Sequence, residues 1–315
     1  MPLNRRDWLA GAASFFSLSA LASCAAEAPD LKIGWQTPLA TQGEIAAILQ
    51  RTALLKENGF DAHFSAFSFG TPQMEAARAD AINVALVGDQ PLINLICAGA
   101  DWKILCRLFD TRVSLFRNSA QPWSGPRGAT FASPRGSVAH REVMFYERSK
   151  GLNPDTDVKN VFVDAAEISA LLARGGNWAG IDVIAIWEPL ASRFDVEPGI
   201  VKLFERKTLG VVGIDGKLAS DRDAVTHLRN AIRGAWDFFL KNETQAHNWY
   251  RAVAGNQLTD ALLMNVARID RSFLNHKPDI DLTDNDKTEL ARSISWAREF
   301  NSQLQPVRVS DIVVP

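Results

Sequence analysis

Residues 83–91 read Asn-Val-Ala-Leu-Val-Gly-Asp-Gln-Pro, and this stretch decides the fold class of the chain. Its apolar part, within residues 82–87, has the length and the composition of a buried strand. Residues 89–91 begin the next helix, in which Asp89 can cap the free N–H groups of the first turn. A buried strand that leads directly into a helix is the unit from which parallel α/β sheets are built.

The same unit recurs on both sides of this stretch. Strand and helix patterns alternate over residues 31–117, and the alternation restarts further along the chain. Residues 118–128 hold two Pro and two Gly, which predicts a loop or a crossing between domains. Residues 181–187 form a second apolar strand that leads into Glu188-Pro189, and the pattern becomes helical after about residue 220. The sequence therefore predicts an α/β protein with a mostly parallel sheet.

Length and composition indicate a globular protein of roughly two domains. The chain has 315 residues, of which 47% are hydrophobic and 22% are charged, and its formal net charge is −2. A balance this close to neutral excludes a large cationic surface, so we expect no nucleic-acid partner. Three cysteines are too few for a disulfide scaffold or a four-cysteine metal site.

The first 30 residues have the pattern of an export signal. Arg5-Arg6 precedes an uncharged run over residues 8–23, which is too short to span a membrane comfortably. The arginine pair resembles the twin-arginine pattern, and Leu21-Ala-Ser-Cys24 resembles a bacterial lipobox. We therefore expect a signal peptide over 1–23, a lipid on Cys24, a linker over 24–30, and a periplasmic or extracytoplasmic, membrane-anchored protein. The alternative is a plain cleaved signal with an incidental cysteine.

Two local patterns bear on the fold of the mature chain. Thr41-Gln-Gly-Glu44 has the spacing of a capping box, so we expect it to open a helix. Cys97 and Cys106 are the only candidate pair for a disulfide in an exported chain. Two separate buried thiols are the favoured alternative.

The motifs of common enzymes are missing. The sequence has no Gly-rich dinucleotide motif, no Walker loop, no His-Glu-x-x-His and no Gly-x-Ser-x-Gly. Its five histidines are scattered, without metal-ligand spacing. A triad assembled in space stays possible, since triads are defined by geometry. We expect neither an enzyme nor a cofactor.

The candidate binding residues lie where strands end and helices begin. In α/β sheets, ligands bind at these junctions, where helix N-termini present free N–H groups and partial positive charge. Each candidate also has a structural alternative: Asp89 and Ser137 can be helix caps, His140 a core or solvated histidine, and Trp35 and Trp187 core aromatics. Arg112 either neutralises an anion or forms a surface ion pair. The junctions are Trp35-Gln36-Thr37, Phe69-Gly70-Thr71, Gly88-Asp89-Gln90-Pro91, 135–140 and Trp187-Glu188-Pro189.

Five segments, taken in order, resemble the type II periplasmic substrate-binding proteins of ABC importers. The similarity is to the group that serves nitrate, sulfonates, taurine and thiamine pyrimidines, and it covers essentially the whole mature chain. No single segment is decisive, but their order is fairly specific. The segments are 31–36, 67–73, 83–91, 136–140 and 181–189.

This resemblance implies a two-lobed fold. Each lobe would be a mixed, mostly parallel sheet flanked by helices, and two hinge crossings would join the lobes. We expect lobe I to comprise 31–117 plus 209–315, with the C-terminal helices packed back on it, and lobe II to comprise 118–208. A ligand would lie between the lobes, and closure would be a hinge motion.

The resemblance also implies the roles of particular residues. Gln36, Gln90 and Ser137 would bind an oxyanion or polar head, and Trp35 and Trp187 would pack on the rest of the ligand. Glu188 would accept from a donor or a cationic group. Arg112, which flanks a predicted strand, is added as a candidate that neutralises an anion. The complete expected site is Trp35, Gln36, Thr71, Gly88, Asp89, Gln90, Arg112, Ser137, His140, Trp187 and Glu188.

The resemblance implies that a monomer captures a small polar or anionic organic ligand, similar to a sulfonate, taurine, nitrate or a pyrimidine, and delivers it to an ABC permease with its ATPase. Two alternatives stay open: an enzyme exported through the twin-arginine route, and a ligand sensor for a signalling partner. Enzymes related to the thiamine-pyrimidine binding proteins carry a cysteine-rich iron-binding segment. Cys97 and Cys106 alone do not provide one.

Overall fold

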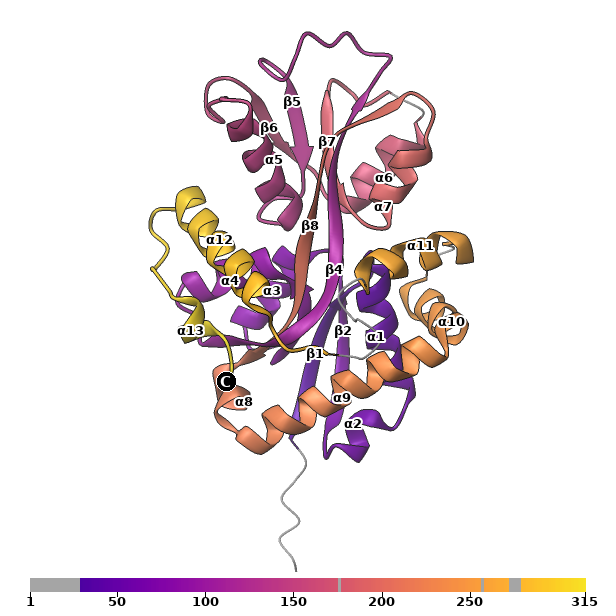
Figure 1. Ribbon diagram of the computed structural model, residues 1–315, viewed down its shortest axis with the longest axis vertical. Helices are drawn as coiled ribbons and strands as arrows, with labels where there is room; N and C mark the ends of the chain where they lie inside the picture. Colours follow the sequence, from indigo (N-terminus) through magenta and orange to yellow (C-terminus); the bar gives the residue numbers. More distant parts are fainter. Residues whose placement is uncertain (1–28, 175–176, 256–257, 272–278) are drawn as a thin grey trace, which may run out of the picture.

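The computed structural model has two lobes that are joined by two long strands (Figure 1). It describes residues 29–174, 177–255, 258–271 and 279–315. The predicted signal peptide, Cys24 and most of the linker lie outside the described residues. The strands are β1 (Asp30–Gln36), β2 (Asp61–Phe67), β3 (Val84–Gly88), β4 (Trp102–Asn118), β5 (Thr130–Ser133), β6 (Lys159–Phe162), β7 (Val183–Trp187) and β8 (Ile200–Asp215).

Helices cover the sheet in both lobes. Those of the second lobe are α5, α6 and α7, and the others surround the first lobe (Figure 1). The helices are α1 (Ala40–Arg51), α2 (Leu54–Glu57), α3 (Gly70–Arg78), α4 (Asp89–Cys97), α5 (Val138–Ser149), α6 (Ala165–Ala173), α7 (Leu190–Val196), α8 (Gly216–Ser220), α9 (Arg222–Lys241), α10 (Glu243–Ala254), α11 (Asp260–Asp270), α12 (Asp284–Phe300) and α13 (Val309–Ile312).

One mixed sheet of eight strands, in the order β2-β1-β3-β8-β4-β7-β5-β6, runs through both lobes. The strand pairs β1–β2, β1–β3, β5–β6 and β5–β7 are parallel. The long strands β4 and β8 pair antiparallel from Trp102 and Asp215 to Asn118 and Ile200. This architecture confirms the predicted α/β fold, and it adds that a single sheet connects the lobes.

The two crossings lie inside the long strands. β8 pairs with β3 of the first lobe through residues 210–214, and β4 pairs with β7 of the second lobe through residues 113–117. We therefore propose that the lobes divide before Val113 on β4, rather than after residue 117. The Pro- and Gly-rich segment that follows β4 is a loop at the far end of the second lobe (Figure 1).

The C-terminal helices pack on the first lobe. α9, α10 and α11 contact α1, and α12 contacts α4. α9 is amphipathic, with Leu228, Ile232 and Trp236 on its buried face. The side chain of Asp221 accepts hydrogen bonds from the backbone N–H groups of Asp223 and Ala224, and so fixes the start of α9.

The predicted capping box at Thr41 and Glu44 is wrong. α1 begins at Ala40, and its N-cap is Leu39, whose side chain makes no capping hydrogen bond. Thr41 and Glu44 are fully buried, and Glu44 Oε1 lies 2.5 Å from Nδ1 of His247 in α10. Packing of α1 against α10 and α11 therefore buries the two side chains that the local pattern assigned to the helix start.

Cys97 and Cys106 are separate buried thiols. Burial raises the pKa of Cys106 to about 12, so this thiol stays protonated at neutral pH. The favoured sequence interpretation, two small apolar side chains in the core, agrees with this arrangement.

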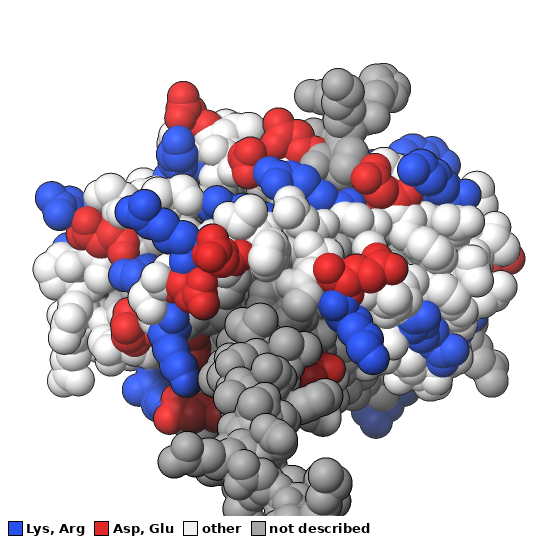
Figure 2. Space-filling model, turned by 90° about the horizontal axis from the view of Figure 1, so that it is seen from below, with Lys and Arg blue, Asp and Glu red and all other residues white. Residues whose placement is uncertain are grey.

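Basic and acidic side chains are interspersed on the face seen from below, where neither sign forms a broad patch (Figure 2). Within the described residues, no helix is long and apolar enough to cross a membrane.

Glu147, in the second lobe, makes the stability of the fold depend on pH. Its side chain is fully buried in α5, where Oε1 accepts a hydrogen bond of 3.0 Å from Asn160 Nδ2 and Oε2 has no partner. Burial raises the pKa of Glu147 from 4.5 to about 7, despite the hydrogen bond from Asn160. The folded protein therefore holds a proton that the unfolded chain releases. Glu147 stabilises the fold most below pH 4.5, and this contribution is lost as the pH rises through about 7.

We expect Glu147→Gln to leave stability nearly unchanged at pH 5 and to raise the free energy of unfolding at pH 8.5. The amide keeps the acceptor for Asn160 and never ionises, so the gain relative to wild type is up to about 3 kcal/mol. Urea unfolding of both proteins across this range measures the difference. A difference that does not change with pH would contradict the prediction.

Candidate functional site

A cavity lies between the lobes, at the carboxyl ends of the strands. Its water-accessible volume is about 20 Å³, which is enough for about one water molecule. The lobes therefore lie closed on each other in this structure. The lining residues are uncharged: Gln36, Leu39, Gly70, Gly88, Pro91, Phe109, Thr111, Ser137, Val138 and Trp187.

Three helices begin at this cavity without a side-chain cap. Leu39 is the N-cap of α1 and Gly88 the N-cap of α4, and α3 begins at Gly70 after Phe69. Leu39, Gly70 and Gly88 all line the cavity. The first turns of a helix carry free N–H groups and a partial positive charge, so these N-termini favour an anion in the cavity.

The fourth helix at the cavity, α5, is capped by its own serine. Ser137 Oγ accepts from the backbone N–H of His140 at 3.3 Å and donates to the carbonyl of Pro134 at 2.6 Å. The hydroxyl is thus already used within the loop, as expected of a helix cap. Ser137 still lines the cavity, where it positions the start of α5.

Two polar side chains, Gln36 and Thr111, lie at the cavity with hydrogen-bonding capacity to spare. Gln36 Nε2 donates to Gln73 Oε1 at 2.9 Å, which leaves its second N–H. Thr111 Oγ1 is buried and has no hydrogen-bond partner in the described part of the chain. A buried hydroxyl without a partner costs free energy. A ligand that accepts from Thr111 would remove this cost.

Aromatic rings form much of the apolar wall. Phe109 and Trp187 are almost fully buried beside the cavity. Gly210 lies opposite Phe109 on β8, and a Cβ on Gly210 would stand 2.2 Å from the Phe109 ring. A glycine at residue 210 is therefore required for the ring to lie flat on the long strand.

Four of the predicted binding residues, Gln36, Gly88, Ser137 and Trp187, line this cavity. Trp35 instead packs toward α1 in the core, because its side chain lies against Gly43 on the face opposite to that of Gln36. Thr71 Oγ1 donates to the carbonyl of Arg135 at 2.9 Å and so links the two lobes.

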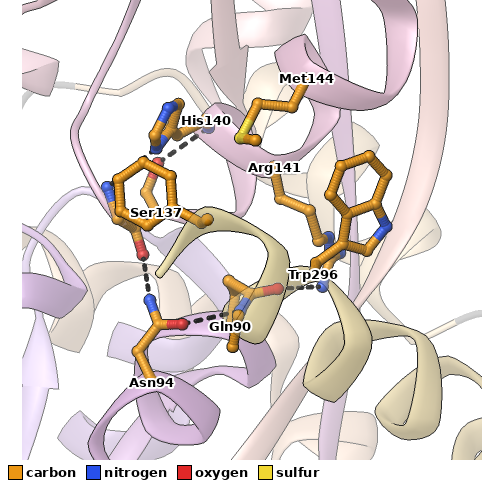
Figure 3. A pocket seen from close by; sticks show the side chains of 10 residues that line it. Gln90, Asn94, Ser137, His140, Arg141, Met144 and Trp296 are labelled. Carbon is orange, nitrogen blue, oxygen red and sulfur yellow. Dashed lines mark hydrogen bonds between the residues drawn. The ribbon is translucent and has the colours of Figure 1, made fainter. Parts of the chain in front are cut away.

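Asp89 and Gln90 belong to a second contact between the lobes. Asp89 Oδ2 lies 2.7 Å from Arg141 Nη1 of α5 and accepts from Ser293 Oγ of α12 at 2.5 Å. Gln90 Nε2 donates to Asn94 Oδ1 at 2.9 Å. Gln90 and Arg141 line a second small space, which Met144, Trp296 and Phe300 also line (Figure 3).

His140 lies over this second space and is neutral. Burial, assisted by the charge of Arg135, lowers its pKa to about 4. The backbone N–H of Gly136 points at Nδ1 from 3.3 Å, which agrees with a neutral ring that accepts at this atom. Its ring packs edge-on against Phe162 and Phe300.

Glu188 and Arg112 form a buried ion pair outside both spaces. Their closest atoms are 2.5 Å apart, and Glu188 Oε2 also accepts from the backbone N–H of Ser192 at 3.0 Å. Arg112 additionally contacts Asp195 and Glu205. Burial raises the pKa of Glu188, and the charge of Arg112 opposes this shift. Contacts of these two residues with a ligand stay predictions.

The sequence interpretation missed Thr111 and Phe109. Both lie in the middle of β4, away from any strand-to-helix junction. The available signal was the polar triplet Asp110-Thr111-Arg112 between two apolar runs, which marks the point where β4 passes the cavity. Among the described residues, no group of three or more His, Cys, Asp or Glu could hold a metal ion.

Comparison with known proteins identifies the fold. No protein-family model and no curated protein matches the sequence. The structure is similar to the alkanesulfonate-binding protein of Xanthomonas axonopodis pv. citri bound to MOPS, with a TM-score of 0.69 and 18% identity over 92% of this chain and 99% of that one. The periplasmic aliphatic sulphonate-binding protein of Escherichia coli gives 0.67 and 17%, over 90% and 91%.

A Candida albicans protein described as having the generic periplasmic binding protein fold gives a TM-score of 0.69 at 12% identity, over 90% of this chain and 96% of that one. At identities this low, the similarity is one of fold. The chain therefore has the periplasmic binding protein fold that the resemblance of its sequence implies.

Proposed function

We propose that the chain is the solute-binding component of an ABC importer. It captures a small anionic organic compound in the cavity on β4 and passes it to a permease with its ATPase, and it makes or breaks no bond. The main support is that three helices without a side-chain cap begin at one cavity, and that no charged residue lines this cavity. The similar solved structures include sulfonate-binding proteins, which supports a ligand of this class.

The chemistry of the cavity favours an anion with an apolar part. Backbone N–H groups, Gln36 and the Thr111 hydroxyl offer neutral donors, and donors of this kind bind oxyanions without a full positive charge. Phe109 and Trp187 lie beside them and offer apolar surface to a carbon skeleton. A sulfonate with a short organic chain matches both the polar donors and the apolar wall of the cavity, whereas nitrate has no apolar part.

The ligand is expected to act by changing the balance between open and closed lobes. Closure places α5 and Trp187 of the second lobe against the N-termini of α1, α3 and α4, so that the cavity is complete only in the closed form. A ligand that contacts both lobes stabilises closure by its difference in affinity for the two forms.

The first test is ligand binding by the exported form of the protein. We expect at least one short-chain sulfonate in a panel with nitrate, sulfate, carboxylates and pyrimidines to raise the melting temperature, because a ligand that binds only the folded state stabilises it. Native mass spectrometry of the purified protein would detect a ligand carried from the cell. Stabilisation by pyrimidines alone, or by nothing in the panel with no ligand carried, would contradict the proposal.

Thr111→Val tests the cavity itself. The change keeps the side-chain shape and removes the donor, so we expect affinity for the stabilising anion to fall about tenfold while the melting temperature without ligand stays equal or rises. Thr208→Val is the matched control. Thr208 is the cross-strand partner of Thr111, is also buried, and also has a hydroxyl without a partner, but it does not line the cavity. Equal losses in both variants would mean that the effect comes from the strands.

We propose that Cys24 carries a lipid anchor that holds the protein at the membrane after export. The support is the lipobox-like Leu21-Ala-Ser-Cys24 behind an uncharged run. Cells that express the full chain should incorporate labelled fatty acid into it and retain it in the membrane fraction. Cys24→Ser should abolish the label, and Cys97→Ser should not. A wild-type protein that is exported and processed without label would overturn the proposal.

A further inference from the structure

His140, in the first turn of α5, lies between the two lobes. Its ring packs edge-on against Phe162 of the second lobe, with ring centroids 5.0 Å apart, and against Phe300 at the end of α12, with centroids 4.9 Å apart. α12 packs on α4 of the first lobe, so the second contact crosses between the lobes. Only 5% of His140 is exposed in this position. Opening of the lobes would therefore separate the ring from Phe300 and give it access to water.

His140 also holds the loop that leads into α5, over residues 134–137. The backbone N–H of Gly136 donates to Nδ1 of His140 at 3.3 Å, so this atom must be unprotonated. Two N–H groups that face each other cannot form a hydrogen bond, and a proton on Nδ1 would break this contact. Neutral His140 therefore stabilises the loop at Gly136.

The first lobe binds the second lobe through the same loop. Thr71 Oγ1 of α3 donates to the carbonyl of Arg135 at 2.9 Å. Asn94 Nδ2 of α4 donates to the carbonyl of Gly136 at 3.2 Å (Figure 3). Ser137, the next residue, lines the proposed anion cavity. The loop thus connects the protonation state of the histidine ring to contacts that close the cavity.

The surroundings of His140 disfavour a proton on its ring while the lobes are closed. Burial and, to a smaller extent, the positive charge of Arg135 lower the pKa of His140 from 6.5 to about 4. Phe162 and Phe300 carry no charge, and within the described ranges no Asp or Glu forms an ion pair with the ring. The closed form therefore binds this proton more weakly than an open form in which the ring is in water.

The other charged groups on the elements around the ring have partners of their own or lie away from it. On α3, Glu75 and Arg78 line a separate space beside Gly136 that His140 does not line. On β6, Lys159 lies at the end of the strand opposite to Phe162. The remaining groups are Arg141, paired with Asp89 and Glu142, Glu299, paired with Arg148, and Asp164, which caps α6.

We propose that neutral His140 is a positioning residue of the closed form, and that its protonation releases the loop at Gly136 and favours opening of the lobes. Ligand binding then weakens as the pH falls. This inference rests on the proposed function, because closure around a ligand is the event that His140 controls.

The pH range follows from the two protonation equilibria of His140. An exposed histidine has a pKa near 6.5, whereas the pKa in the closed form is about 4. The open form is therefore the better proton acceptor. The contribution of His140 to closure is fully present above pH 6.5, and it is lost as the pH falls from 6.5 toward 4.

The test is the pH profile of anion binding, measured by calorimetry. The probe is ethanesulfonate or, if it stabilises the protein more, another short-chain sulfonate of the panel, because sulfonates keep their charge between pH 8 and pH 5. We expect wild-type affinity to be constant above about pH 7 and to fall by up to about tenfold at pH 5.5. Direct contact of a protonated His140 with the anion would have the opposite effect, because it adds a positive charge. Tighter binding in acid would therefore overturn the inference.

Two variants of His140 separate the proton from the packing of the ring. His140→Asn places an amide oxygen near the position of Nδ1, where it can accept from Gly136 without titrating. We expect nearly wild-type affinity at pH 7.5 and no loss at pH 5.5. His140→Phe keeps an aromatic ring but accepts no hydrogen bond, so binding should be weaker at both pH values, again without a pH profile. Melting temperatures identify the folded variants, and a profile that persists in either folded variant would contradict the inference.

His63 and Glu147 provide the controls. His63 is an exposed histidine on β2, and Glu147 titrates in α5 but lines neither of the two spaces between the lobes. His63→Asn and Glu147→Gln should both keep the pH profile of binding. Loss of the profile in Glu147→Gln would assign it to that carboxylate and not to His140.

The outcomes also separate this inference from the proposed function. Sulfonate binding with the same affinity from pH 8 to pH 5 overturns the role of His140 and leaves the solute-binding function standing. No binding at any pH, with no stabilisation by any sulfonate of the panel, overturns the proposed function and the inference with it.

Discussion

The antiparallel pairing of β4 with β8 is the interaction on which the two-lobed structure depends. The two strands hydrogen-bond to each other from the base of the first lobe to the far end of the second, and each lobe adds its other strands to their edges. Their register shifts between Arg107 and Phe109, just before the cavity. Bulges of this kind re-aim side chains. This one precedes Phe109 and Thr111, which both reach the cavity.

The contact between Asp89 and Arg141 joins the two lobes. The pair is almost fully buried where the lobes meet. Closure therefore gains Coulomb attraction and loses the hydration of both charges, and these terms nearly cancel for buried pairs. A contact with a small net free energy fixes the geometry of the closed form and leaves the balance between the forms sensitive to a ligand.

Much of the fold could be predicted because it depends on local patterns. The apolar runs at 82–87 and 181–187, each followed by a helix start, correspond to β3–α4 and to β7 and the turn before α7. The cavity residues Gln36, Gly88, Ser137 and Trp187 could be predicted for the same reason, since strand ends meet at one edge of a parallel sheet. What the pattern could not show is that β4 and β8 continue through both lobes, because a loop and a crossing look alike in sequence.

The ion-pair partners of the charged side chains could not be predicted from the sequence, for a different physical reason. Asp89 pairs with Arg141 and Glu188 pairs with Arg112, and these partners are 52 and 76 residues apart in the chain. A carboxylate at a helix start has the same appearance in the sequence whether it meets a ligand or an arginine. Thr41 and Glu44 fit a capping box locally, yet packing of α1 on α10 and α11 turned both into buried groups.

The charges around the cavity are arranged so that they do not repel an anion inside it. The lining is uncharged, and the carboxylates just behind it at Glu44, Asp110 and Glu188 are each held against a base. An unpaired carboxylate at those places would repel an anion across a medium of low dielectric constant, where a single charge acts strongly over several ångströms. Pairing cancels most of that field.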